Sequence, residues 1–180
     1  VFSAGVDLPA LLAGSVDDTR RFLEILVRFF HRLAVCEKPI VAAVNGHAIA
    51  GGCIIMLACD YRVAARLSKA KIGVTELLVG VPFPAWPLEI VRFAVPPQHF
   101  QALVYTGMTV NPDEALARGM VDEVVEADAL LERALEMARL LAAVPAATFK
   151  LSKGAMRQPL CEAVARTSRL YDADAMRAWQ

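Results

Sequence analysis

The sequence has no excess of charge of either sign. Its 180 residues include 19 Lys and Arg and 19 Asp and Glu, so the formal net charge is zero. A protein that binds nucleic acid or a membrane surface through charge needs a local or overall positive excess. The balance therefore argues against nucleic acid and against a membrane surface as partners.

The sequence also lacks a hydrophobic run long enough to cross a membrane. The richest stretch, residues 48–59, contains two glycines and ends at Asp60, whereas a helical span needs about 20 apolar residues. Hydrophobic residues nevertheless make up 57% of the chain and charged residues 21%. This composition is typical of a folded domain with a sizeable core.

Cysteine and histidine are scarce. The four cysteines form no Cys-x-x-Cys pair, and the three histidines do not cluster with them, so the pattern does not predict a zinc site. Cys53 and Cys59 stand in an apolar run and are interpreted as small buried side chains. Such cysteines favour a reducing compartment, and we expect a cytoplasmic protein.

Apolar periodicity predicts an α/β fold. Residues 22–33 carry apolar side chains at spacings of three and four, which indicates an amphipathic helix of about 17 residues. Residues 40–44 form a β-branched run that predicts a strand buried on both faces. Prolines at 82, 84 and 87 are expected to prevent a long element before Leu88. Further strands are predicted at 61–65, 72–74 and 121–125, and further helices at 53–59, 112–118, 127–143, 146–156 and 160–179.

Two backbone segments are candidates for binding an anionic oxygen. Gly51 and Gly52 separate a predicted strand from a predicted buried helix, and N–H groups at a helix start suit a negative oxygen. The segment 2–8 ends a strand in small residues, and Asp7 can accept hydrogen bonds from nearby backbone N–H groups. Glycines for packing and an ordinary turn are the plainer readings of these two segments.

Glu76 is the candidate acid or base. It lies among apolar residues, with only Thr75 polar beside it. A carboxyl group in apolar surroundings has a raised pKa and can act as a base near neutral pH. The alternative is a solvated glutamate at the start of a helical turn.

Five segments occur in an order that closely resembles the crotonase superfamily of enoyl-CoA hydratases and isomerases. They are residues 2–8, 38–53, 59–64, 72–80 and 105–125. The resemblance implies an α/β fold of the crotonase type, a spiral of ββα turns with a helical C-terminal region. We expect the spiral core and thioester site at residues 1–125 and the helical region at 126–180, with further segments missing at both ends.

The resemblance also implies roles for individual residues. The backbone N–H groups of Val6 and Gly51 would form an oxyanion hole for a thioester, and Glu76 would be the catalytic acid and base. Family hydratases often have three glycines where this chain has Ala50 and two glycines, and alanine is tolerated there if φ is not positive. Other implied substrate-binding residues are Ala4, Gly5, Asp7, Gly52, Ile54, Phe83 and Trp86.

Ile54 is the main departure from the family pattern. Family hydratases carry a second glutamate at the matching position, and the two glutamates position water. With one carboxylate left, moving a double bond from position 3 to position 2 of an acyl-CoA is the favoured reaction, because one base can shuttle the proton. The surroundings of Glu76, with Pro82, Phe83 and Trp86, also resemble the Δ3-Δ2-enoyl-CoA isomerase branch.

Other readings stay open. The chain can be an enoyl-CoA hydratase, a crotonase-type hydrolase, decarboxylase or dehalogenase, or a non-catalytic acyl-CoA binder in which Glu76 is a relic. The resemblance implies no permanently bound cofactor, with coenzyme A entering as part of the substrate. It also implies a homo-oligomer, a trimer or hexamer, and the leucines between positions 130 and 141 are numerous for a late helix.

Overall fold

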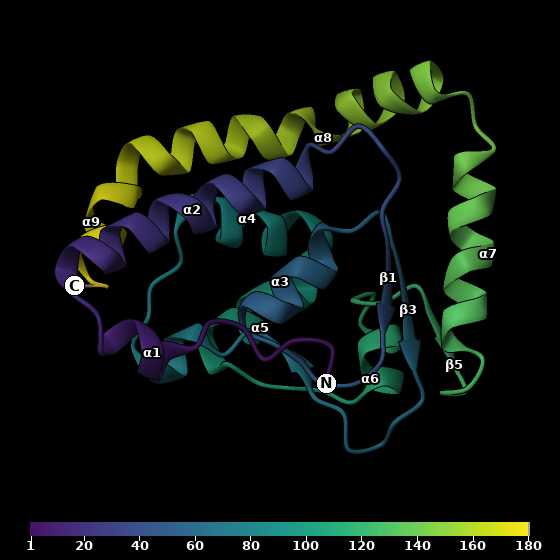
Figure 1. Cartoon of the computed structure of the whole chain (residues 1–180), viewed down its shortest axis with the longest axis horizontal. Helices are drawn as coiled ribbons and strands as arrows, with labels where there is room; N and C mark the ends of the chain where they lie inside the picture. Colours follow the sequence, from purple (N-terminus) through teal and green to yellow (C-terminus); the bar gives the residue numbers. More distant parts are fainter. Residues whose placement is uncertain (180) are drawn as a thin grey trace.

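Two small parallel sheets lie among helices in the computed structural model, which describes residues 1–179 (Figure 1). The larger sheet has the strand order β1-β3-β5, and β1 and β3 run side by side with Val44 paired to Ala64. The smaller sheet pairs β2 with β4. The strands are β1 (Val41–Val44), β2 (Ala48–Ile49), β3 (Tyr61–Ala65), β4 (Ile72–Gly73) and β5 (Glu123–Val125).

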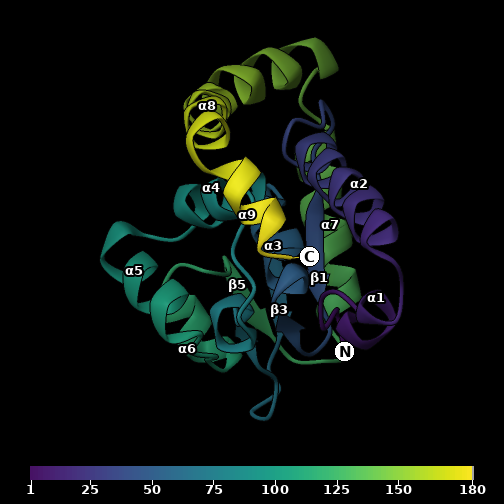
Figure 2. The ribbon, with the colours of Figure 1, turned by 90° about the vertical axis from the view of Figure 1, so that its left-hand side faces the viewer.

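Helices cover both faces of the larger sheet. One face packs on α7, with Val63 and Ala65 against Leu130 and Ala134. The other face belongs to the main core, which α3 and α4 fill and which α2 and α8 cover (Figure 2). The helices are α1 (Leu8–Leu12), α2 (Val16–Ala34), α3 (Gly51–Ala58), the 3-10 helix η1 (Glu76–Val79), α4 (Ala85–Ala94), α5 (Pro97–Thr106), α6 (Pro112–Ala117), α7 (Leu130–Ala142), α8 (Ala146–Thr167), the π-helix η2 (Ser168–Asp172) and α9 (Ala173–Arg177).

Local sequence signals explain several helix starts. Ser15 and Asp18 form a capping box at α2, and Asn111 and Glu114 form another at α6. In each box a side chain accepts a hydrogen bond from a backbone N–H that the helix leaves without a partner. The predicted start of the helix at Pro112 is thereby confirmed.

The division of the C-terminal region into helices 146–156 and 160–179 is wrong. The two begin as one helix, α8, which contains Pro159. Pro159 and Ala155 are both exposed, so the carbonyl that the proline leaves unpaired can reach water. The prediction of no long element before Leu88 is confirmed, since α4 begins only at Ala85, with Pro87 in its first turn, where a helix does not need the missing N–H.

Within residues 1–179, no helix is both long enough and apolar enough to span a bilayer.

Asp60 holds distant parts of the chain together. One of its carboxylate oxygens accepts hydrogen bonds from the Ile40 N–H at 2.8 Å and from Lys153 Nζ at 2.6 Å. The other accepts from Arg157 Nη2 at 3.2 Å. Lys153 also donates to the Lys38 carbonyl and Arg157 to the Ala58 carbonyl. The cluster therefore fixes α8 against the start of β1 and the end of α3.

Replacing Asp60 with Ala should lower the free energy of unfolding by roughly 3–5 kcal/mol, because two buried cations lose their shared counter-charge. The measurement is urea unfolding followed by circular dichroism. Asp17→Ala is the matched control: its ion pair with Arg20 is largely exposed and should contribute less than about 1 kcal/mol. Equal losses in the two variants would contradict this account of Asp60.

Candidate functional site

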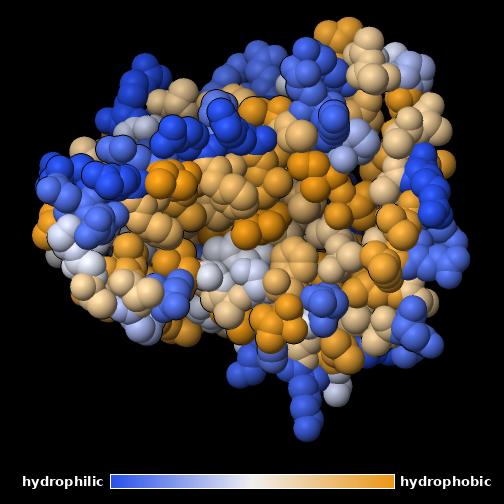
Figure 3. Space-filling view, in the orientation of Figure 1, coloured by the Kyte–Doolittle hydropathy of each residue, from blue (hydrophilic) through white to orange (hydrophobic). Residues whose placement is uncertain are grey.

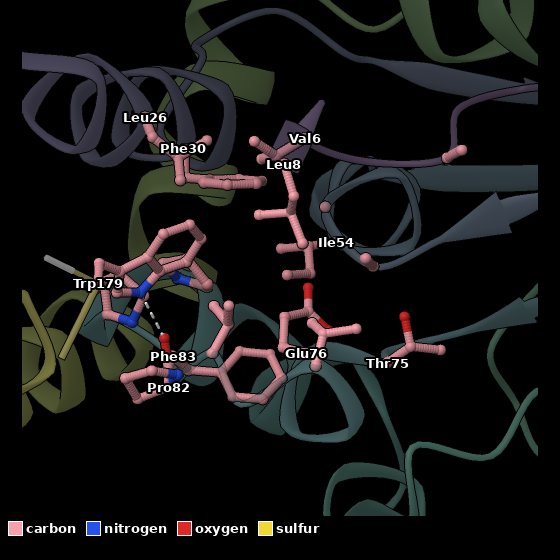
Figure 4. A pocket seen from close by; sticks show the side chains of 17 residues that line it. Val6, Leu8, Leu26, Phe30, Ile54, Thr75, Glu76, Pro82, Phe83 and Trp179 are labelled. Carbon is pink, nitrogen blue, oxygen red and sulfur yellow. Dashed lines mark hydrogen bonds between the residues drawn. The ribbon is translucent and has the colours of Figure 1, made fainter. Parts of the chain in front are cut away.

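A mostly apolar cavity of about 200 Å³ lies between the N-terminal segment, α2, α3 and residues 75–87. Its wall includes Val6, Gly51, Ile54, Glu76 and Phe83, which come from four separate segments (Figure 4). Within the described part of the chain, Glu76 is the one titratable side chain in this wall. The cavity therefore presents a single acid or base to whatever binds there.

The carboxyl group of Glu76 is held in surroundings that disfavour its charge. Burial raises its pKa to about 7, while the backbone N–H groups of Glu76 and Thr75 lower it to a smaller extent. Its Oε2 atom is buried and has no hydrogen-bond partner within residues 1–179. An unpartnered carboxyl group with a pKa near neutrality can accept and return a proton at physiological pH. The first residue of η1 is thus a half-buried acid or base whose Oε2 atom is shielded from solvent, and not the solvated glutamate of the alternative reading.

Ile54 lies next to this carboxyl group. Its side chain is buried within α3 and lines the cavity close to Glu76 (Figure 4). The aliphatic side chain gives a water molecule no hydrogen-bond partner there. The position that would carry a second carboxylate in the resemblance therefore faces the cavity, and an apolar group fills it.

Val6 and Gly51 meet at the same wall of the cavity. The chain around them is in close contact: a Cβ built on Gly5 would lie 3.1 Å from the Gly51 nitrogen. Gly51 is the first residue of α3, where N–H groups have no partner inside the helix. Across residues 1–179, neither the Val6 N–H nor the Gly51 N–H donates to another loop, strand or side chain. Both donors remain available to a ligand.

Ala50 has a backbone conformation that alanine rarely adopts. Its φ is 52° and its ψ is −128°, directly before α3, and it is the one non-glycine residue with positive φ in residues 1–179. The condition under which alanine would be tolerated here, a φ that is not positive, is therefore not met. The methyl group clashes with backbone in this region, at a cost of about 1–3 kcal/mol. The surrounding contacts hold this strain immediately beside the Gly51 N–H.

The structure divides the other predicted site residues into two groups. Ala4 and Phe83 line the cavity with Glu76. Gly5 and Asp7 instead line a second, more open cavity of about 570 Å³ between α1, α2 and α3, whose wall also includes Val6 and Gly51. Asp7 caps α1 by accepting a hydrogen bond from the Ala10 N–H at 3.1 Å. Apolar side chains cover much of the molecular face below α2 (Figure 3).

Gly52 and Trp86 lie outside the walls of both cavities. A Cβ on Gly52 would lie 2.2 Å from the Ser3 carbonyl oxygen, so glycine is needed for the close approach of two backbones. Trp86 stacks on His31, with ring centroids 4.8 Å apart. It belongs to the first turn of α4, which turns its indole toward α2, whereas Phe83 precedes the helix and points into the cavity (Figure 4).

Sequence reasoning missed three large side chains of the cavity. Leu26 and Phe30 belong to the apolar stripe of α2, and a stripe of this kind does not distinguish core from cavity wall. Trp179 comes from beyond α9 and donates its indole N–H to the Pro82 carbonyl at 2.9 Å. No local sequence pattern predicts a contact between residues 97 positions apart.

Comparison with known proteins gives one consistent family. A sequence model described as enoyl-CoA hydratase/isomerase matches residues 1–177. A short-chain-enoyl-CoA hydratase of Clostridium acetobutylicum is 33% identical over 157 residues, covering 87% of this chain and 59% of that protein. The mitochondrial enoyl-CoA delta isomerase 1 of Mus musculus is 32% identical over 158 residues, covering 88% of this chain and 55% of that protein.

The fold comparison agrees. The crystal structure of human mitochondrial delta3-delta2-enoyl-CoA isomerase superimposes with a TM-score of 0.87 at 30% identity, covering 99% of this chain and 68% of that one. Such a match confirms the crotonase-type α/β fold. The chain spans little more than half the length of the curated relatives described above.

Replacing Ala50 with Gly should raise the free energy of unfolding by about 1 kcal/mol. Relief of the strained conformation outweighs the greater freedom of glycine in the unfolded chain. Ala155→Gly, on the exposed side of α8, is the control and should lower it by about 1 kcal/mol. Chemical unfolding of both variants measures the difference, and a loss of stability in both would show that Ala50 is not strained.

Proposed function

The chain belongs to the enoyl-CoA hydratase/isomerase family, and we propose that its site moves the double bond of a 3-enoyl-CoA to position 2. The observation that carries this proposal is the single carboxyl group of Glu76, with a pKa of about 7, facing the buried side chain of Ile54. One group of this kind is enough for a proton shuttle between two carbons of the same substrate.

The reaction needs one base and a site for developing negative charge. The Glu76 carboxylate removes a proton from C2, and the electrons of the C–H bond move toward the thioester oxygen to form a dienolate. The N–H groups of Val6 and Gly51 donate hydrogen bonds to that oxygen. Glu76 then returns the proton to C4, the carbonyl re-forms, and the double bond lies between C2 and C3. No water and no external proton donor are consumed.

The two cavities support an acyl thioester as the substrate. Val6 and Gly51 belong to the walls of both. A thioester held between their N–H groups would place its acyl chain in the cavity with Glu76. Its pantetheine arm would leave through the more open cavity beside α1 and α2. This division also supports recognition of the substrate through its thioester group.

Hydration is the alternative within the family, since hydratases and isomerases are similar to this chain at almost equal identity. A hydratase must orient a water molecule and supply a proton to carbon, which two carboxylates can share. The apolar Ile54 disfavours that arrangement here. An alternative of another class is a non-catalytic acyl-CoA binder, which would not exchange the C2 proton of a bound acyl-CoA in deuterated water, whereas a working base would.

Assembly and location stay predictions. Apolar side chains are exposed on α7 and on α8, among them Leu131, Leu140, Leu151 and Met156. Such side chains suit burial between subunits of a homo-oligomer, a trimer or hexamer by family resemblance, and a zero net charge does not oppose it. A cytoplasmic location is expected from the free cysteines only.

Glu76→Gln should lower the isomerisation rate by roughly 10²–10⁴, because the amide keeps the shape and cannot accept the proton. In the wild type, kcat/KM should rise with pH and level off above about 7, since burial raises the pKa of the Glu76 base to about 7. Both are measured with a 3-enoyl-CoA substrate. Glu89→Gln is the control, a buried glutamate outside the cavity, and isomerisation that survives Glu76→Gln at the control's rate would exclude Glu76 as the base.

Ile54→Glu should raise hydration of a 2-enoyl-CoA relative to isomerisation of a 3-enoyl-CoA. The new carboxyl group would give water a partner next to Glu76, and the proximity of two carboxyl groups would raise the pKa of one of them. Ile54→Gln is the control, because it is polar but cannot act as a base. Both reactions are assayed in all three proteins. A wild type that already hydrates faster than it isomerises would overturn the isomerase proposal.

A further inference from the structure

The chain after α8 leaves the helical path and folds over the segment that follows Glu76. The π-helix η2 widens the last turns, and α9 follows at once. Figure 2 shows α9 lying across the front of the molecule beside α4. This tail, residues 168–179, therefore returns to the cavity from the far end of the sequence.

Three hydrogen bonds tie the end of α8 and the tail to α4 and to the loop that precedes it. Thr167 Oγ1 donates to Glu89 Oε1 at 2.7 Å, and Asp172 Oδ1 accepts from the Ala85 N–H at 2.7 Å. Trp179 Nε1 donates to the Pro82 carbonyl at 2.9 Å. Along the tail the bonded residues follow in the order 167, 172 and 179, whereas their partners follow in the order 89, 85 and 82. The two segments therefore run antiparallel, and the three bonds fix their register. The Trp179 backbone N–H also donates to the Met176 carbonyl at 3.4 Å, so this residue is held through both its backbone and its ring.

Trp179 is the one wall residue of the Glu76 cavity that lies beyond Pro87 in the described sequence. In Figure 4 its indole lies on one side of Glu76 and Ile54, and Thr75 lies on the other. Phe83, Pro82 and Phe30 surround the space between the indole and the carboxyl group (Figure 4). The indole thus closes one side of an apolar space that begins at the reacting groups.

We propose that Trp179 is a specificity-determining residue that limits the length of the acyl chain. The inference rests on the proposed function in so far as it takes an acyl thioester between Val6 and Gly51 as the ligand. A chain that runs past Glu76 meets the flat face of an indole that cannot move aside without breaking its hydrogen bond to Pro82. A further methylene group beyond that point buries no additional apolar surface, so it does not raise the affinity for the acyl-CoA.

The test is equilibrium binding of saturated acyl-CoA thioesters of increasing length, from butanoyl to hexadecanoyl, to the full chain. Saturated thioesters cannot isomerise, so the result does not depend on the reaction. In the wild type, affinity should rise by about fourfold with each methylene and then stop rising. In Trp179→Ala the rise should continue for several further methylenes at about the same increment.

Two variants serve as controls. Trp179→Phe keeps an aromatic wall and loses the N–H. The acyl-chain length at which its affinity stops rising should therefore fall between the values for the wild type and Trp179→Ala. Leu170→Ala changes an exposed side chain of the same tail and should keep the wild-type limit. The proposal would be overturned if the affinity of Trp179→Ala stopped rising at the same acyl-chain length as in the wild type. It would also be overturned if the affinity fell by the same factor at all chain lengths.

A second measurement decides the matter if Trp179→Ala does not fold. The chain has two tryptophans, so Trp86→Phe leaves Trp179 as the sole indole emitter. Its emission should shift to the blue only with acyl chains long enough to reach it, starting at the length where the affinity stops rising. Emission that responds to butanoyl-CoA as strongly as to long chains would contradict the role of an end wall.

Failure of the isomerase proposal looks different. A wild type that binds acyl-CoA with the expected length limit but does not isomerise a 3-enoyl-CoA would support the role of Trp179 and exclude the isomerase activity. A wild type that binds no acyl-CoA of any length would exclude both.

Discussion

The half-buried carboxylate of Asp60 forms the interaction on which much of this arrangement depends. It pairs with both Lys153 and Arg157 on one helix and accepts a hydrogen bond from the Ile40 N–H at the entrance to β1. A helix of mixed polarity such as α8 has no strong apolar stripe to fix its rotation about its own axis. Two charged anchors one helical turn apart fix that rotation instead. The direction in which the chain leaves α8, and hence the path of the tail to the cavity, follows from this ion cluster.

One wall of the Glu76 cavity is built from segments that pack with almost no free space between their backbones. The Ser3 carbonyl passes so close to Gly52 that no side chain fits there, and a Cβ on Gly5 would lie 3.1 Å from the Gly51 nitrogen. Ala50 is forced into positive φ at this junction. Strain of this kind persists only where many contacts determine the conformation. The position of the Gly51 N–H is therefore set by the close packing of backbones at this junction.

Local patterns predicted the elements that local interactions determine. The start of α6 after Asn111 and the apolar run of β1 were predictable because their causes lie within a few residues. Glu76 was found from its apolar neighbours and Ile54 through the order of motifs, and the structure places their side chains together. Trp86 and Trp179 were not predictable in the same way. The rotation of α4 and a contact between residues 97 positions apart determine which indole faces the cavity. Neither produces a periodic pattern in the sequence.

The π-helical turn has a consequence for how the length of this chain can vary. A π-helix accommodates one more residue per turn than the α-helix it interrupts, and each residue in an α-helix rotates the following chain by about 100°. Deleting one residue from η2 would continue α8 as a regular helix and rotate Asp172 away from the Ala85 N–H that it caps. All residues further along, the indole included, would then point elsewhere, although no residue in the cavity had changed. Single-residue insertions and deletions at Ser168–Asp172 could thus change the shape of the cavity during evolution without a substitution at Glu76 or Ile54.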